Sequence, residues 1–225
     1  MKEFKRGVVL AAVFALLGFA AGCSDDDSGN PDTGGDGDVF DAPPDVVEED
    51  TAHPEEETGP VDYPPAPYGV LVGDRIENLR FVDTEGNPLE LAQFYADHGV
   101  KLLWIFATAG WCSVCTIQSR AMDGIYTTFH PQGLEILAVI FENGTGEPAT
   151  AAYAASYKRT YGWSFAAASD QPFVLGRYFD KAATPMNMLV DLTDMTIVSI
   201  EMGWGEASER SLIESNLASI ADRTP

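Results

Sequence analysis

The sequence is short of cysteine, histidine and positive charge. Its 225 residues contain three Cys, three His and 13 Lys and Arg against 35 Asp and Glu, which gives a net charge of −22. A structural zinc site needs about four ligands. His53, His98 and His130 show no ligand spacing to a cysteine pair, so we expect no metal and no cofactor. With no basic stripe to neutralise phosphates, nucleic acid is excluded as a partner.

Long apolar runs are also scarce, and the longest one is at the N-terminus. Gly7–Ala21 follows a basic head of three residues and is too short for a permanent membrane span. A basic head followed by a short apolar run that ends in small residues is typical of a secretory signal. We therefore assign residues 1–22 to a signal peptide.

The residues that follow the apolar run suggest a lipid anchor. Ala20-Ala21-Gly22-Cys23 resembles a bacterial lipobox, which implies cleavage before Cys23 and lipidation of that cysteine. Several acyl chains together would hold the protein durably to a membrane. Ser24 after the cysteine implies the outer membrane of a bacterial envelope, with the rest of the chain in the periplasm or at the cell surface. Cleavage nearby without a lipid is the alternative.

Residues 24–62 contain fifteen Asp and Glu and no Lys or Arg. Such a segment cannot bury enough apolar surface to offset its ordering entropy, so we expect residues 23–62 to form a disordered acidic tether behind the anchor. The remaining residues, 63–225, have the length of a single domain.

The two other cysteines, Cys112 and Cys115, mark the centre of that domain. Val100–Phe106 is an apolar run of the length of a buried strand, and Thr116–Phe129 has apolar residues at helical spacing. The Cys-x-x-Cys pair therefore lies where a strand turns into a helix. Unpaired N–H groups and the positive end of a helix dipole stabilise a thiolate there, and thiol pKa values in such sites fall from about 8.5 to roughly 3.5–7.5.

These positions predict a reversible dithiol–disulfide couple, in which Cys115 attacks a mixed disulfide formed on Cys112. A static structural disulfide is the alternative. It is disfavoured because a bridge across two intervening residues closes a very small loop and constrains little of the unfolded chain.

The rest of the domain alternates strands and helices. We expect a hairpin, a short helix, the Cys-x-x-Cys strand and helix, a strand, a helix, a further strand and a short helix, then a hairpin and a closing helix. An α/β fold with a mixed central sheet follows. The expected ranges are 79–91 for the first hairpin, 91–98, 100–106, 116–129, 134–141, 149–161, 163–168 and 172–179 for the elements in turn, 186–201 for the second hairpin, and 207–220 with Ser208 as N-cap for the last helix.

Two motifs together resemble the thioredoxin superfamily. They are Trp111-Cys-Ser-Val-Cys115 at a strand–helix junction and Thr184-Pro185 at the start of a hairpin. The N-terminal hairpin and the inserted helix are similar to the redoxin branch, which includes membrane-tethered, TlpA-like disulfide reductases. The resemblance implies a thioredoxin-like fold with an N-terminal β-hairpin extension.

The resemblance also implies roles for individual residues. Cys112 would be the nucleophile, Cys115 the resolving thiol and Pro185 a cis-proline facing the disulfide. Thr184 would offer its backbone to an extended substrate chain, and Trp111 would cover the sulfurs. The implied function is exchange of disulfides with protein substrates outside the cytoplasm, by a monomer that is reset by a separate redox partner.

Four residues, at three places in the sequence, depart from the family pattern. Phe106 stands where thioredoxin has a buried acid, and Gln118 stands where TlpA-like reductases often carry a Glu. Gln118 can hydrogen-bond but cannot titrate, so it cannot take a proton from the resolving thiol. Ser113-Val114 lacks the proline common between the cysteines of reducing members, which leaves the direction of electron transfer open.

Two other functions stay open at this stage. A peroxiredoxin-like peroxidase shares the fold, but it uses a Pro and a Thr shortly before its cysteine. Here Thr108 lies four residues ahead of Cys112, where three is usual, and no proline lies between Phe94 and Cys112. The third alternative is a non-catalytic, anchored binding module whose cysteine pair is a structural bridge or a switch.

Overall fold

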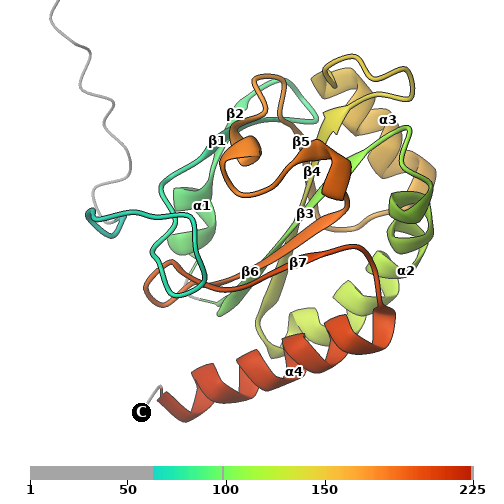
Figure 1. Cartoon of the computed structure of the whole chain (residues 1–225). Coiled ribbons are helices and arrows are strands. Elements are labelled where there is room, and N and C mark those ends of the chain that lie inside the picture. Colours follow the sequence, from blue (N-terminus) through green and yellow to red (C-terminus); the bar gives the residue numbers. More distant parts are fainter. Residues whose placement is uncertain (1–62, 98, 224–225) are drawn as a thin grey trace, which may run out of the picture. The chain divides into compact units, whose positions relative to one another are not determined.

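The structure, a computed structural model, describes residues 63–97 and 99–223, which form a seven-stranded mixed sheet in the order β2-β1-β5-β4-β3-β6-β7 (Figure 1). The predicted signal peptide, the lipidation site Cys23 and the acidic tether lie outside the described residues. The elements are β1 Arg80–Asp83, β2 Pro88–Glu90, α1 Leu91–Tyr95, β3 Leu102–Ala109, α2 Ser113–Phe129, η1 His130–Gln132, β4 Leu134–Glu142, α3 Ala151–Tyr161, β5 Ala166–Ser169, η2 Val174–Arg177, η3 Lys181–Ala183, β6 Met186–Asp191, β7 Thr196–Met202 and α4 Glu206–Arg223.

The middle of the sheet is parallel. β3 pairs with β4 and β4 with β5 in parallel, while β6 and β7 on one side and the β1–β2 hairpin on the other add antiparallel edges. Every residue of β3 is buried. A strand covered on both faces favours apolar residues throughout, which is why residues 102–109 are apolar except for Thr108 rather than alternating. The expected mixed sheet and first hairpin are confirmed.

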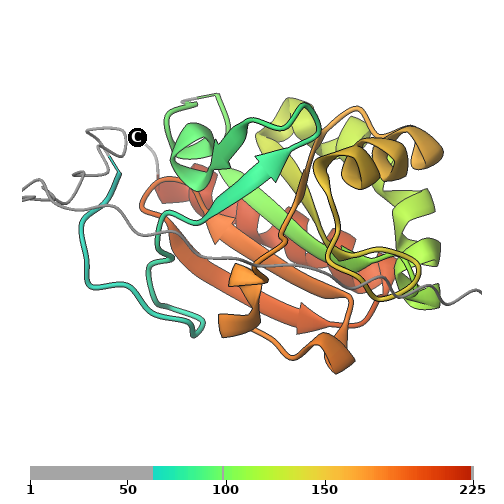
Figure 2. The same cartoon turned by 90° about the horizontal axis from the view of Figure 1, so that it is seen from above.

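Helices cover both faces of this sheet. The crossovers β3–α2–β4 and β4–α3–β5 have the same right-handed sense, so they place α2 and α3 on one face. The closing helix α4 packs against α2 on that same face. Figure 1 shows α1 on the opposite side, together with the 3-10 turns that precede β6, and Figure 2 shows the same layers from above.

Some expected elements differ in type or in length. The segment 172–179, expected to be a short helix, forms only the 3-10 turn η2, because Phe173 adopts a positive φ of 56° and Asp170 accepts the N–H groups of Val174 and Leu175. The predicted cap at Ser208 is wrong. The helix already begins at Glu206, and the Ser208 hydroxyl donates to the carbonyl of Gly205 at 2.7 Å.

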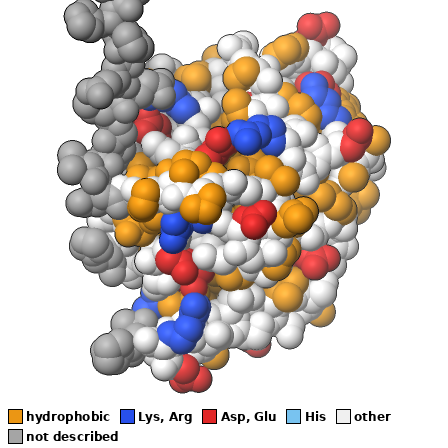
Figure 3. Space-filling view, turned by 60° about the vertical axis from the view of Figure 1, so that its left-hand side comes forward, with side chains coloured by type: hydrophobic (Ala, Val, Ile, Leu, Met, Phe, Trp, Pro, Cys, Tyr) orange, Lys and Arg blue, Asp and Glu red, His pale blue; other side chains and the backbone are white. Residues whose placement is uncertain are grey.

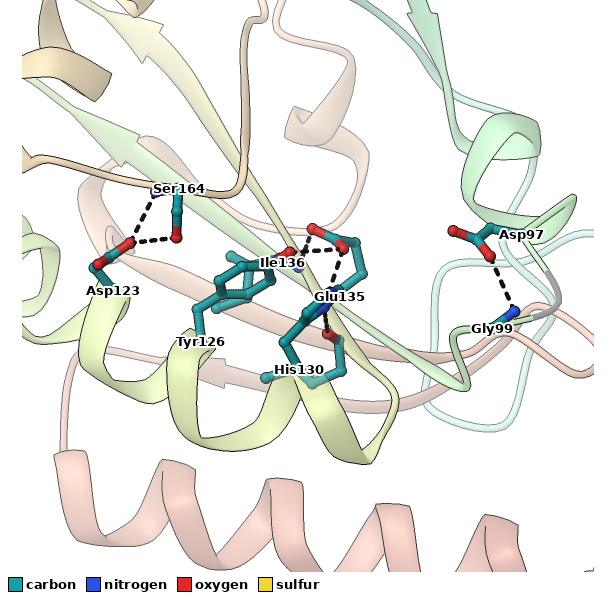
Figure 4. A network of polar contacts seen from close by, with 9 residues as sticks. Asp97, Gly99, Asp123, Tyr126, His130, Glu135, Ile136 and Ser164 are labelled. Atoms are coloured by element: carbon teal, nitrogen blue, oxygen red, sulfur yellow. Dashed lines mark hydrogen bonds and ion pairs between the residues drawn. The ribbon is translucent and has the colours of Figure 1, made fainter.

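Polar contacts fix the end of α2 that lies away from the cysteines (Figure 4). Asp123 accepts both the N–H and the hydroxyl of Ser164, at 2.8 and 2.7 Å. One turn further on, the Tyr126 hydroxyl donates to Glu135, and the His130 ring stacks on Tyr126. These contacts join α2 to β4 and to the start of β5, so the helix is held at both ends.

Acidic and basic side chains are intermixed with hydrophobic ones on the face drawn in Figure 3, and some of the opposite charges adjoin. Exposed large apolar residues at the start of the domain are Tyr68, Leu71 and Val72. Within the described part of the chain, no helix is both long and apolar enough to cross a membrane.

Candidate functional site

The Cys-x-x-Cys pair lies at the carboxyl end of β3, where the chain turns into α2. Cys112 is the N-cap of α2, which begins at Ser113, three residues before the predicted start at Thr116. Cys112 forms a disulfide with Cys115. The Cys112 sulfur accepts the backbone N–H of Cys115 at 3.1 Å. Because this N–H is one of the unpaired donors of the first helical turn, it would equally stabilise a thiolate on Cys112.

The two sulfurs differ in access. Cys112 is 6% exposed and Cys115 is fully buried. Around Cys112, the apolar side chains of Trp111, Val114 and Ile117 face solvent. An incoming disulfide therefore meets Cys112 before Cys115, next to apolar side chains that are exposed on the same short segment of chain.

The segment Thr184-Pro185 faces the disulfide from the start of β6. Its peptide bond is cis, which confirms that expectation. The Thr184 carbonyl oxygen lies 4.0 Å from the Cys112 sulfur, and its hydroxyl lies 3.9 Å from the Cys115 sulfur. The Thr184 N–H already donates to the Lys181 carbonyl at 3.3 Å, so a substrate chain that pairs here would use the Thr184 carbonyl or displace this long hydrogen bond.

Trp111 does not stand alone beside the sulfurs. Its indole N–H donates to the Glu142 carboxylate at 2.8 Å, and its ring meets Phe141 edge-on. Glu142 also pairs with Lys181, the first residue of η3, which lies three residues before Thr184 of the cis peptide. The hydrogen bond from Lys181 is the main reason that the pKa of Glu142 is lowered. One carboxylate thus braces both sides of the site.

Gln118 is fully buried one turn beyond Cys115. Its amide donates to the side-chain oxygen of Asn187 at 2.5 Å, and that oxygen also accepts the indole N–H of Trp104 at 3.0 Å. The side-chain oxygen of Gln118 has no hydrogen-bond partner. Trp104 itself is fully buried in the core.

Two other positions singled out in the sequence lie away from the sulfurs. Phe106 is buried and packs edge-on against Trp163, so no carboxylate enters the core from that position. The Thr108 hydroxyl lies 3.4 Å from the hydroxyl of Tyr157, whose pKa burial raises to about 12. The side chain that a peroxidase would need beside its cysteine is therefore directed at α3.

Sequence reasoning missed Glu142, Lys181 and Asn187. One signal was available for the first of these. Ala109 pairs with Glu142 across the parallel strands β3 and β4, and carboxyl ends of neighbouring parallel strands meet at one edge of a sheet. A charged residue that ends the strand after the Cys-x-x-Cys helix is thus a candidate neighbour of the site. Asn187 and Lys181 offer no comparable local pattern.

The AhpC/TSA family model matches residues 72–199, more than half of the 225-residue chain, and the match includes both cysteines and Pro185. The chain belongs to the AhpC/TSA family. No curated protein is similar enough to this family member to count as a match.

Several solved structures share the fold of this AhpC/TSA protein. The thioredoxin domain of a thiol-disulfide oxidoreductase from Bacteroides vulgatus is 18% identical, with a TM-score of 0.53, over 66% of this chain and 99% of that one. A thiol:disulfide interchange protein from a Bacteroides species is 16% identical, with a TM-score of 0.53, over 65% and 90%. Peroxidoxin BcpB from Mycobacterium tuberculosis is 13% identical, with a TM-score of 0.54, over 68% and 99%. The fold is thioredoxin-like, as expected.

Proposed function

We propose that this AhpC/TSA protein is an extracytoplasmic thiol–disulfide oxidoreductase that exchanges disulfides with protein substrates. The observation that carries the proposal is the placement of Cys112, the more exposed of the two cysteines, at the start of a helix with its sulfur 4.0 Å from the Thr184 carbonyl oxygen and bonded to the fully buried Cys115. The exposed apolar side chains of Trp111, Val114 and Ile117 favour an unfolded or extended protein segment over a small polar oxidant.

The exchange balances without a metal or an organic cofactor. A Cys112 thiolate attacks a substrate disulfide, forms a mixed disulfide and releases one substrate sulfur, which takes up a proton. Cys115 then loses its proton and attacks the Cys112 sulfur, which releases the second substrate thiol and leaves the Cys112–Cys115 disulfide. Two electrons pass to the substrate, and a separate thiol reductant must return them. Run in reverse, the same steps oxidise a substrate dithiol.

The surroundings of the two cysteines suit them to the two attack steps. The N–H of Cys115 stabilises the attacking thiolate, and the burial of Cys115 keeps the second sulfur from reacting before the first. Gln118 offers an unpartnered oxygen one turn beyond Cys115 but no titratable group. Proton removal from Cys115 therefore falls to water or to the departing substrate thiolate.

The location is part of the proposal. The signal peptide of residues 1–22, lipidation at Cys23 and the acidic tether support a monomer held at a bacterial envelope membrane, with its redox domain standing off the surface. Cys23→Ala should move the protein from the membrane fraction to the soluble extracytoplasmic fraction, whereas Cys112→Ser should leave it in the membrane.

The catalytic proposal is tested with paired cysteine variants of the tether-free domain in insulin reduction. Cys112→Ser retains a good N-cap residue, so it removes the nucleophile without removing the cap. It should abolish reduction, and Cys115→Ser should accumulate a mixed disulfide on Cys112. Full activity of the Cys112→Ser protein would overturn the assignment.

A peroxidase reaction is the second candidate, favoured by the family and by the peroxidoxin among the similar folds. The direction of the Thr108 hydroxyl, toward Tyr157, argues against it. Hydrogen peroxide consumption by the reduced domain, at a rate above that of free cysteine, would favour this candidate over disulfide exchange.

A further inference from the structure

Glu209 is a largely buried acidic residue whose carboxylate has no protein partner in the described part of the chain. It lies in the first turn of α4 and is 3% exposed. Within the described residues its side chain makes no ion pair or hydrogen bond, and the neighbouring base, Arg210, is engaged with Glu206. Burying an ionised carboxylate is costly unless it is paired, so such a group needs a reason.

The carboxylate lines a pocket of about 260 Å³ at the junction of β7 and α4. Glu201 lies on the same wall and raises the pKa of Glu209 further, beyond the main effect of burial, to about 7. Trp204 lines another part of the pocket and stacks on the buried Trp104, with ring planes 14° apart. Met202, exposed to solvent, and Leu212 supply apolar surface.

This pocket adjoins the disulfide-exchange site. The N–H of Gly203, in the wall of the pocket, donates to the carbonyl of Pro185 at 2.8 Å. Pro185 follows Thr184, whose carbonyl oxygen faces the Cys112 sulfur. A substrate chain lying across Thr184 thus passes beside the pocket within a few residues, since an extended chain advances about 3.3 Å per residue.

The lining selects an organic cation. Two carboxylates attract a positive charge, an indole ring adds a cation–π contact, and apolar walls suit an aliphatic stem. A metal ion fits poorly, because the described part of the chain contains no group of three His, Cys, Asp or Glu able to hold one. The volume is below the roughly 300–1,000 Å³ of cavities that take drug-sized ligands, and it suits a single side chain.

We propose that this pocket binds a lysine or arginine side chain of the protein substrate, close in sequence to the substrate cysteine. The inference rests on the proposed disulfide exchange and adds to it a preference for substrates with a basic residue beside the reactive cysteine. The cation would supply the missing partner of Glu209, with Glu201 at the rim.

The test uses disulfide-bonded peptides that carry lysine or the uncharged norleucine at each of the three positions on either side of the cysteine. For the wild-type domain we expect kcat/KM to be about tenfold higher for lysine than for norleucine at the best position, as for a charge-assisted contact. Glu209→Gln should reduce this ratio to about threefold or less. Glu201→Gln should reduce it to a smaller extent.

Glu214→Gln is the matched control, because it makes the same change of charge at an exposed position of α4. It should leave the ratio unchanged. Equal rates for the lysine and norleucine peptides with the wild-type domain, or an equal fall in the ratio for Glu209→Gln and Glu214→Gln, would overturn the proposal while disulfide exchange itself stands.

A binding measurement separates this failure from failure of the exchange reaction. Peptides in which serine replaces the cysteine are titrated onto the oxidised domain, and the indole N–H signal of Trp204 is followed by NMR. A shift with the lysine peptide that is lost in Glu209→Gln supports the pocket even if no peptide is reduced. No difference between lysine and norleucine peptides argues against it.

Discussion

The side-chain amide of Gln118 donates to Asn187, and the oxygen that receives this hydrogen bond is shared with Trp104. Asn187 in turn donates to the carbonyl of Gly203 at 2.8 Å. The Asn187 oxygen therefore faces Gln118 as an acceptor, so a hydrogen-bond donor fits at position 118 and a second acceptor does not. A carboxylate at 118 would place an acceptor against an acceptor.

Gln118→Glu should therefore be destabilising at high pH. Below its folded pKa, the protonated acid can donate to Asn187 as the amide does. Above it, the buried charge faces the Asn187 oxygen, so stability falls as pH rises. We expect the free energy of unfolding to be lower than that of the wild type by about 1–3 kcal/mol at pH 8, and by much less at pH 5. Urea titrations of the oxidised domain measure this difference.

Gln118→Met is the control for that variant, since it removes the unpartnered oxygen as well as the donor. Its free energy of unfolding should be close to that of the wild type and should show no added pH dependence. Equal stability of Gln118→Glu at pH 5 and pH 8 would contradict the role assigned to Asn187.

The contacts of Glu142 with Trp111 and Lys181 should make the free energy of unfolding fall at acid pH. The pKa of Glu142 is lowered, chiefly by Lys181, so its contribution is present above the unfolded pKa near 4.5 and is lost as pH falls below that value. Lys181 is partly exposed, so we expect Glu142→Gln to cost a few tenths to about 1 kcal/mol at pH 7 and almost nothing at pH 3. Glu147→Gln, at an exposed position in the following loop, should be neutral at both pH values.

Close packing before the cysteines makes Gly110 sensitive to any side chain. A Cβ atom there would lie 2.0 Å from the Tyr153 hydroxyl and 2.7 Å from the backbone nitrogen of Gly144. Gly110→Ala should lower the free energy of unfolding by about 1–3 kcal/mol through overpacking. At Gly144 the nearest atom would be 3.9 Å away, so Gly144→Ala should be tolerated. Thermal unfolding of the two variants side by side measures the contrast, and equal melting temperatures would argue against the close approach at Gly110.

Glu209 should make the free domain less stable as pH rises. Its folded pKa of about 7 lies above the unfolded value of 4.5, so the folded state holds a proton that the unfolded state has lost in this range. The contribution is fully present below pH 4.5 and disappears as pH rises through 7, a change of about 3 kcal/mol. Glu209→Gln should abolish this part of the pH dependence and be the more stable protein at pH 8, whereas Glu214→Gln should follow the wild-type curve in urea titrations from pH 5 to pH 8.

The central features of the site could be predicted from the sequence because they depend on residues that follow one another in the chain. An apolar run, a Cys-x-x-Cys and an amphipathic run place a sulfur at a helix N-terminus whatever the rest of the fold, and Thr184-Pro185 gained its meaning from resemblance. The structure moves the strand to residues 102–109 and starts the helix at Ser113, which makes Cys112 itself the cap.

Features that depend on distant partners could not be predicted in this way. Asn187 meets Gln118 across 69 residues of chain, and Glu142 meets Lys181 across 39. Ser208 was expected to cap α4 by residue type alone. The helix instead begins at Glu206, two residues before Ser208, directly after the turn at Gly205. The acidic pocket likewise arises only when the end of β7 is folded against the first turns of α4.

The single N–H that points at the Cys112 sulfur also affects how the redox couple responds to acidity. A dithiol that keeps both protons binds two protons with its two electrons, so its midpoint potential falls by about 59 mV per pH unit. When the helix keeps Cys112 ionised, only one proton accompanies the electrons and the slope is halved to about 30 mV. Where the pH around the protein follows that of the external medium, the helix N-terminus would thus make the midpoint potential of the couple change less with pH.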